Sequence, residues 1–311
     1  MAQKQQRSVD PLRAKVSEMR LAQQRAERRT RIIVISAVGL IVLAIIAAVG
    51  GVIWQQQSEV SAARNVEPSD VLGVYADGRP LVVNGHGVSA EPDPNLPTLT
   101  EYCDYSCHAC ADVDAALGED LTTWASERHY NLELQPVITV NMDYLKPATG
   151  ASLVVAQKAP DKWIEFHHAL LAYFRTQFQS GNGTVVRNMD ASWKQIKQIA
   201  SEVGVPEDVI ATFPVNAVGS YLKDSSAAWS GATYEGRDPQ KLGTPEFVKD
   251  HASVVPLGST LEETRESFKQ LFAIDETSTP TTSILTEPGA TPPAQSGAEE
   301  SQSGETTTGS D

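Results

Sequence analysis

The longest apolar stretch of the chain runs from Ile32 to Trp54 and contains no charged residue. As a helix that rises about 1.5 Å per residue, it can cross a hydrocarbon core of about 30 Å. A cleaved secretory signal usually has an apolar core of only about 7–15 residues before its cleavage site. The pattern therefore predicts a retained transmembrane anchor over residues 32–54, with Trp54 at one membrane interface.

Residues 69–274 alternate between short apolar runs and amphipathic stretches, which predicts a folded α/β domain. Strands are expected over residues 98–106, 132–141, 241–248 and 252–257, preceded by a hairpin over residues 71–83. Helices are expected over residues 107–128, 151–158, 161–174, 193–199, 207–213, 216–229 and 261–272. The last of these helices would begin with Ser259 as its N-cap and Glu262 completing a capping box.

The remaining segments differ from this domain in composition. Residues 55–68 look like a linker that follows the anchor. Residues 275–311 are rich in Thr, Ser, Pro, Gly and Glu, and they contain no Lys, Arg or aromatic residue. Such a segment cannot bury enough apolar surface to offset the entropy lost on ordering. We therefore expect residues 275–311 to form a disordered acidic tail.

Charge is distributed unevenly about the anchor. Residues 1–31 carry nine Lys or Arg and three acidic residues, a net charge of +6, whereas the whole chain carries −14. The positive-inside rule places this basic arm in the cytoplasm and the domain outside the cell membrane. The arm is expected to contact the anionic lipid bilayer. The acidic exterior argues against nucleic acid as a partner.

The three cysteines, Cys103, Cys107 and Cys110, lie within eight residues of one another. Outside the cytoplasm they would meet an oxidising environment. Two thiols spaced as Cys-His-Ala-Cys at the start of a helix can close a small disulfide, and the helix N-terminus favours the thiolate of the first. A structural zinc site would want four ligands, usually from two such pairs. The spacing thus favours a redox centre over a structural bridge or a metal site.

Two motifs resemble those of the DsbA-like branch of the thioredoxin-fold thiol–disulfide oxidoreductases, in its membrane-anchored Gram-positive form. They are Glu101-x-x-Asp104-Tyr105-x-Cys107-x-x-Cys110 and Gly243-Thr244-Pro245-x-Phe247. The resemblance covers residues 69–274. It implies a thioredoxin fold with a helical insertion at about residues 148–232.

The resemblance also implies roles for individual residues. Cys107 would be the nucleophile, and Cys110 would resolve the mixed disulfide. Thr244–Pro245 would be a cis peptide bond facing the two cysteines, with the backbone of Thr244 free to pair with an extended substrate strand. Glu101 matches a buried acid that exchanges protons near the resolving thiol, although a solvated edge-strand charge is an equal alternative.

His108 departs from the family pattern, which commonly has proline at this position and often histidine at the next. A histidine beside Cys107 can still stabilise the thiolate by charge or hydrogen bond. A stabilised thiolate makes the disulfide more oxidising, so a strong oxidant is expected, with an isomerase or reductase left open. The third thiol, Cys103, is expected to be a small buried apolar side chain.

The remaining histidines suggest no metal site. His167 and His168 are adjacent on a predicted helix, so their side chains should point about 100° apart and should not pair as ligands. We expect them to be packing or surface residues.

The sequence thus predicts an extracytoplasmic enzyme that introduces disulfides into reduced secreted or envelope proteins without a soluble cofactor. A membrane quinone-linked reoxidase is implied as a partner by family analogy. Two alternatives stay open. One is a thioredoxin-fold module that binds peptides without catalysis, and the other is a copper chaperone that uses Cys103, Cys107, Cys110 and His108.

Overall fold

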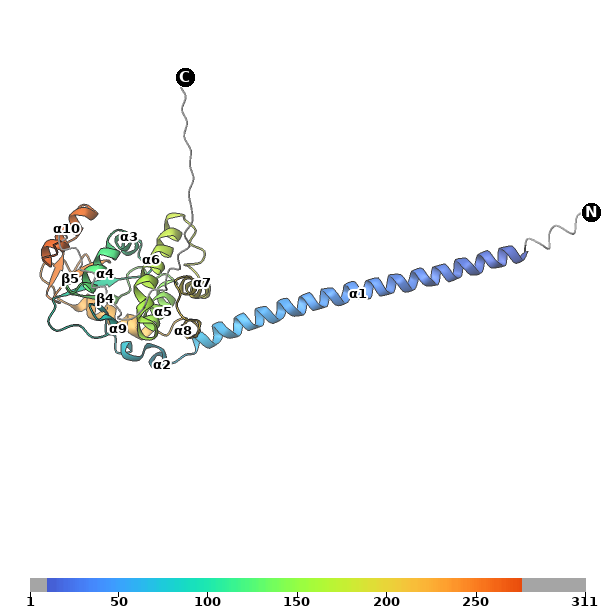
Figure 1. Ribbon diagram of the computed structural model, residues 1–311, viewed down its shortest axis with the longest axis horizontal. Coiled ribbons are helices and arrows are strands. Elements are labelled where there is room, and N and C mark those ends of the chain that lie inside the picture. Colours follow the sequence, from blue (N-terminus) through green and yellow to red (C-terminus); the bar gives the residue numbers. More distant parts are fainter. Residues whose placement is uncertain (1–9, 276–311) are drawn as a thin grey trace, which may run out of the picture. The chain divides into compact units, whose positions relative to one another are not determined.

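A six-stranded mixed sheet forms the centre of the folded domain in the computed structural model, which describes residues 10–275 (Figure 1). The strand order is β2-β1-β4-β3-β5-β6. In chain order the strands are β1 (Leu81–Asn84), β2 (Gly87–Ser89), β3 (Thr98–Cys103), β4 (Asn131–Pro136), β5 (Glu246–Lys249) and β6 (Ser253–Val255). Only β3 and β4 pair in parallel, and the other neighbours are antiparallel.

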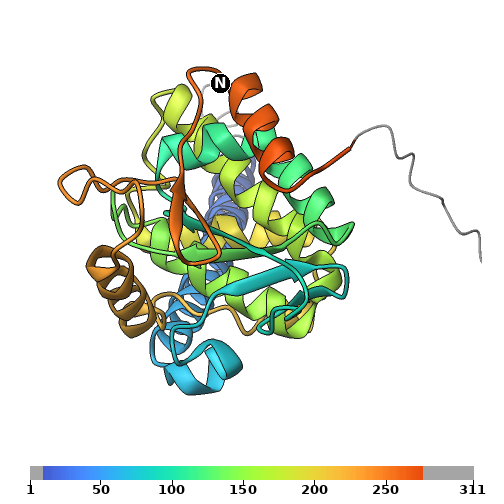
Figure 2. The ribbon, with the colours of Figure 1, turned by 90° about the vertical axis from the view of Figure 1, so that its left-hand side faces the viewer.

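Helices cover both faces of the sheet (Figure 2). One face carries Tyr102 of β3, whose ring lies 6.0 Å from that of Trp229 on α9 (Gly219–Gly231). The other face carries Phe247 of β5, which packs edge-on against Phe268 of α10 (Leu261–Leu271) at 5.0 Å. The same face packs against the segment that follows β3, namely α3 (His108–Val113), the π-helical turn η2 (Asp114–Gly118) and α4 (Glu119–Ser126). The strand–helix–strand unit and the final hairpin and helix form the expected thioredoxin arrangement.

A block of helices is inserted between β4 and β5, as expected from the resemblance. It consists of α5 (Leu145–Lys158), η3 (Pro160–Lys162), α6 (Trp163–Gln179), α7 (Met189–Glu202), α8 (Glu207–Ile210) and the already described α9. Large aromatic side chains such as Trp163, Phe166 and Phe174 are completely or almost completely buried between these helices. The block therefore shares one hydrophobic core with the sheet. The exact boundaries of the insertion stay predictions.

The N-terminal segment is one continuous helix, α1 (Asp10–Arg64). Within the described residues, it is the one helix long and apolar enough to cross a membrane. Residues 55–64, which the sequence suggested to be part of a linker, continue this helix. Its last turns contact the domain, because the carbonyl of Ala63 accepts a hydrogen bond from the Val215 amide at 3.0 Å and Arg64 pairs with Asp190.

Three local predictions were wrong. The first arm of the expected hairpin is helical, in α2 (Pro68–Leu72) and η1 (Gly73–Tyr75). The hairpin is formed by β1 and β2 instead. The helix expected over residues 107–128 is interrupted by η2. The capping box of α10 uses Thr260 and Glu263, one residue later than expected, because the Thr260 hydroxyl reaches the Glu263 amide. The predicted tail lies outside the described residues, apart from Asp275.

Candidate active site

Cys107 is the N-cap residue of α3, and Cys110 lies one helical turn further on. The extended backbone of Cys107 ends the loop after β3, and its amide donates a hydrogen bond to the carbonyl of Asp104 at 2.8 Å. Cys107 is 6% exposed and Cys110 is fully buried. The two thiols therefore differ in access as a nucleophile and a resolving thiol should, since only Cys107 reaches the surface.

The Thr244–Pro245 bond is cis and lies opposite Cys107, which agrees with the geometry that the resemblance implied. The thiol of Cys107 donates a hydrogen bond to the carbonyl oxygen of Thr244 at 3.3 Å. Residues 137 positions apart in the sequence thus meet at one point. Thr244 and Pro245 are partly exposed, so an incoming chain can approach this point from solvent.

Asp104 holds the loops around the thiols together, a role that sequence reasoning missed. One carboxylate oxygen accepts from the amide and hydroxyl of Ser106 at 2.7 and 2.6 Å. The other accepts from the amides of Thr139 and Val140, each at 2.8 Å. The hydroxyl of Thr139 in turn lies 2.7 Å from that of Thr244. The Asp-x-Ser spacing after a strand signals the first contact, an Asx turn, but not the second.

The pKa of Cys107 is raised, whereas the sequence predicted a stabilised thiolate. The hydrogen bond with the Cys110 thiol, burial and the charge of an ionised Cys110 raise the pKa of Cys107, and a hydrogen bond with the Thr244 side chain and one with the Cys110 backbone only partly offset them. Burial above all also raises the pKa of Cys110. Two nearby thiols titrate as a coupled pair, so the second ionisation is disfavoured by the first. The reduced pair is therefore held as a dithiol.

The structure shows where the ring of His108 lies, and its stabilisation of the Cys107 thiolate stays a prediction. It is exposed, and its ring stacks on that of Phe178 with centroids 4.6 Å apart and planes 7° apart. The ring therefore contacts the helical block. We assign His108 no hydrogen bond to the nucleophile.

Glu101 and Cys103 lie beneath the two thiols on the central strand β3. Glu101 is 6% exposed, and burial followed by the charge of Asp114 raises its pKa to about 8. The alternative of a solvated edge-strand charge is therefore wrong. Cys103 is buried as expected; its hydrogen bond with Cys110 lowers its pKa, but burial and nearby carboxylates raise the pKa to about 12 overall.

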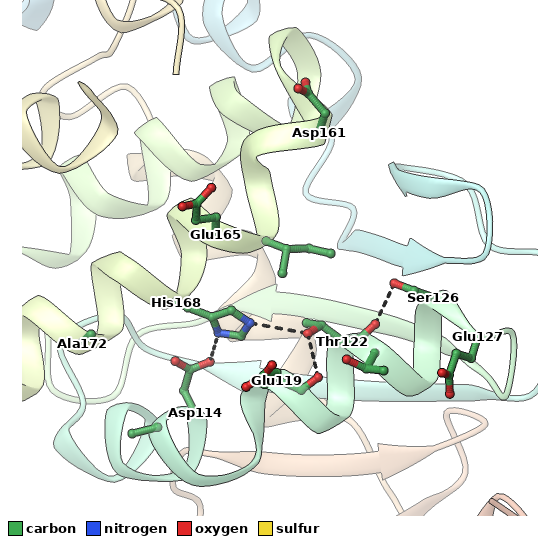
Figure 3. Close-up of a pocket in the computed structure, with 12 residues that line it drawn as sticks. Asp114, Glu119, Thr122, Ser126, Glu127, Asp161, Glu165, His168 and Ala172 are labelled. Carbon is green, nitrogen blue, oxygen red and sulfur yellow. Dashed lines mark hydrogen bonds and ion pairs between the residues drawn. The ribbon is translucent and has the colours of Figure 1, made fainter. Parts of the chain in front are cut away.

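His167 and His168 reach the same group, although the helical spacing suggested that they should not pair as ligands. Both approach the carboxylate of Asp114 on η2, His168 Nδ1 at 2.7 Å and His167 Nε2 at 3.6 Å (Figure 3 shows the His168 contact). The prediction failed because an imidazole has two nitrogens at different places on its ring. Adjacent histidines can therefore face one group through Nε2 of the first and Nδ1 of the second.

No protein-family model matches the chain, and no curated protein matches its sequence. Solved structures do match. The MdbA protein, a thiol-disulfide oxidoreductase from Actinomyces oris, superposes with a TM-score of 0.50 at 22% sequence identity, covering 67% of this chain and 99% of that one. MdbA from Corynebacterium diphtheriae gives a TM-score of 0.44 at 13% identity, covering 63% and 99%. BdbD from Bacillus subtilis gives 0.44 at 15% identity, covering 63% and 94%.

The likeness to the Actinomyces oris structure concerns the fold. It confirms that this chain has a DsbA-like thioredoxin fold in which helices interrupt the α/β core. The match extends over nearly the whole of that protein, so the present domain contains every major part of the fold.

Proposed function

We propose that this protein is an extracytoplasmic thiol–disulfide oxidoreductase that acts through Cys107 and Cys110. The observation that carries the proposal is the position of Cys107 Sγ, at the surface end of α3 and 3.3 Å from the carbonyl oxygen of Thr244. A substrate sulfur that reaches Cys107 must come close to this carbonyl. An extended substrate strand could therefore donate a backbone N–H to Thr244 while its cysteine reacts.

The exchange proceeds in two steps when the pair is oxidised. A substrate thiolate attacks Cys107 Sγ, the Cys107–Cys110 bond breaks, and Cys110 leaves as a thiolate that takes up a proton. A second substrate thiolate then attacks the substrate sulfur of the mixed disulfide and expels Cys107. The substrate gains a disulfide and loses two electrons, which the Cys107–Cys110 pair accepts together with two protons.

Glu101 is suited to move a proton in this cycle. It lies on the same face of β3 as Cys103, which hydrogen-bonds Cys110, and its pKa of about 8 lets both protonation states occur near neutral pH. We therefore assign Glu101 as the proton donor and acceptor for Cys110. His108 receives no direct part in the exchange.

The direction of exchange follows from the proposed location. The helix α1 would anchor the chain with the basic arm in the cytoplasm and the domain outside, where reduced secreted or envelope proteins emerge. Net oxidation of these substrates requires an acceptor for the electrons, and a membrane quinone-linked reoxidase would fill that place by analogy. The raised pKa of Cys107 removes one reason to expect a strongly oxidising disulfide, so a milder potential is compatible with the proposal.

A module that binds peptides without catalysis is the second candidate. The raised pKa values of Cys107 and Cys110 favour it, because a protonated thiol is a poor nucleophile at neutral pH. In this case the partly exposed surface at Thr244 and Pro245 would bind an extended chain whether or not the two cysteines are present.

One experiment separates the two candidates. The full chain in detergent micelles is mixed with a reduced, unfolded multi-cysteine protein and oxidised glutathione as the electron acceptor, and disulfide formation is followed by thiol titration. Catalysis that disappears in Cys107→Ala but persists in the matched control Cys103→Ala supports the oxidoreductase. Peptide binding by a Cys107→Ala/Cys110→Ala variant, with no catalysis by the unmodified chain, would instead support the binding module.

A further inference from the structure

We propose that Asp114, His167 and His168 form a binding site for a divalent transition-metal ion such as Zn²⁺. Each residue offers one ligand atom, and the three atoms lie within 4.8 Å of one another. The residues come from two elements, η2 and α6, that pack against each other. The site is a different group of side chains from the three thiols.

The donor set suits zinc. Zinc binds imidazole nitrogen and carboxylate oxygen at about 2.0–2.2 Å, commonly with three protein ligands and one open position. The carboxylate oxygen of Asp114 lies 2.7 Å from His168 Nδ1 and 3.6 Å from His167 Nε2. Tetrahedral ligands at these bond lengths are about 3.4 Å apart, so each of these two distances would need to change by under about 1 Å.

Contacts on the side opposite the Asp114 carboxylate hold the ring of His167 in place. Its Nδ1 lies 2.9 Å from the hydroxyl of Tyr105, which is also 2.8 Å from Ser152 Oγ, and the ring stacks on Trp163 at 4.8 Å. When Nδ1 of His167 donates to Tyr105, Nε2 carries no proton. Its lone pair then faces the carboxylate of Asp114, so two acceptors lie side by side. A bound cation would interact favourably with both the nitrogen and the carboxylate. Such outer hydrogen bonds commonly orient metal-binding histidines.

The backbone makes room for the site. Asp114 begins the π-helical turn η2, and such turns are frequent at functional sites. The turn ends at Gly118, where a Cβ atom would lie 2.4 Å from Asp114 Oδ1 and 2.8 Å from His168 Cε1. Any larger residue at this position would displace the carboxylate and the imidazole. The absence of a side chain here therefore preserves the arrangement of two of the three ligands.

The site faces a cavity of about 720 Å³, along whose wall Asp114 and His168 lie (Figure 3). Four other carboxylates line this cavity: Glu119, Glu127, Asp161 and Glu165. No lysine or arginine is among the described residues that line it. The excess of negative charge attracts cations. His168 is 26% exposed, so an ion can enter from the cavity and keep a water molecule as its fourth ligand.

The test is Zn²⁺ binding by the full chain in detergent micelles, measured by calorimetric titration. Asp114→Asn and His168→Ala each remove one ligand, and Glu127→Gln is the matched control, because it removes a carboxylate of the same cavity away from the ligands (Figure 3). Co²⁺ serves as a second probe, because thiolate ligands give it a sulfur-to-metal charge-transfer absorption that nitrogen and oxygen ligands do not. Thermal unfolding with and without Zn²⁺ shows whether each variant is folded.

We expect the unmodified chain to bind one Zn²⁺, with a Co²⁺ spectrum that lacks thiolate absorption. Asp114→Asn and His168→Ala should weaken binding by at least about tenfold, since even the loss of a residue behind a ligand costs about 10–100-fold. Zn²⁺ should raise the unfolding temperature of the control and of the unmodified chain, but not that of His168→Ala. The proposal is overturned by an absence of stoichiometric binding, by binding that both ligand variants retain, or by a thiolate spectrum.

Discussion

The thiol of Cys107 donates its hydrogen bond to the carbonyl oxygen of Thr244, a group that also borders the route by which a substrate would arrive. This bond stabilises the protonated thiol. When Cys107 is oxidised it has no proton to donate, and the carbonyl becomes available to a substrate N–H. The same carbonyl would therefore keep the Cys107 thiol protonated in the reduced protein and accept a hydrogen bond from the substrate in the oxidised protein.

We predict that the pKa of Cys107 in the reduced protein lies above that of a free thiol. In the reduced protein, alkylation of Cys107 should have its half-maximal rate above the pH of about 8.5 that is typical of a free thiol. Cys110→Ala should lower this midpoint, because it removes the hydrogen bond that raises the Cys107 pKa most and also removes the charge of Cys110, which raises it further. Rates are measured against pH, with mass spectrometry to locate the alkylated residue. A midpoint well below 8.5 in the unmodified chain would contradict the dithiol description.

Asp104→Asn should destabilise the fold and slow disulfide exchange. An amide keeps one acceptor oxygen, so either Ser106 or the amides of residues 139–140 lose their partner in a buried site. The loss of hydrogen bonds to a buried charge costs about 2–4 kcal/mol of unfolding free energy, which denaturant unfolding measures. The control is Asp112→Asn, a half-exposed residue paired with Arg175, for which we expect about 0–1 kcal/mol. Equal losses in the two variants would refute the organising role of Asp104.

Glu101→Gln should change how stability depends on pH. Because the pKa of Glu101 is about 8 in the folded domain and near its ordinary 4.5 in the unfolded chain, the folded state binds more protons between these values. The free energy of unfolding of the parent chain should therefore fall as pH rises from about 4.5 to about 8, by at most about 5 kcal/mol. The glutamine variant should lose this component of the slope. An unchanged slope would show that Glu101 is ionised in the fold.

The local parts of the site could be predicted from sequence. The strand before Cys107 and the helix after it each have their signal within a few residues, whereas the cis Thr244–Pro245 bond was implied by the resemblance. The amphipathic spacing of the later helices likewise predicted the helices of the inserted block, whereas their insertion into the thioredoxin fold was implied by the resemblance. Residues 71–75 were harder, because a short apolar run bounded by a turn fits a strand or a helix equally well.

The contacts between distant segments could not be predicted. Asp104 acts on residues 139–140, and no local pattern links these positions. The meeting of Asp114 with His168 depends on a π-helical turn and on the packing of α6 against it. The raised pKa of Cys107 arises from the hydrogen bond with Cys110 and from burial, and these effects outweigh the helix N-terminus on which the thiolate prediction relied.

Exchange through Cys107 can be tested by trapping the mixed disulfide between Cys107 and a substrate. The full-length Cys110→Ala variant is incubated with a peptide carrying an activated disulfide, and the covalent product is mapped by mass spectrometry. We expect a single peptide adduct at Cys107, formed faster as pH rises. An adduct at the buried Cys103, or no adduct while the peptide still binds, would rule out disulfide exchange through Cys107.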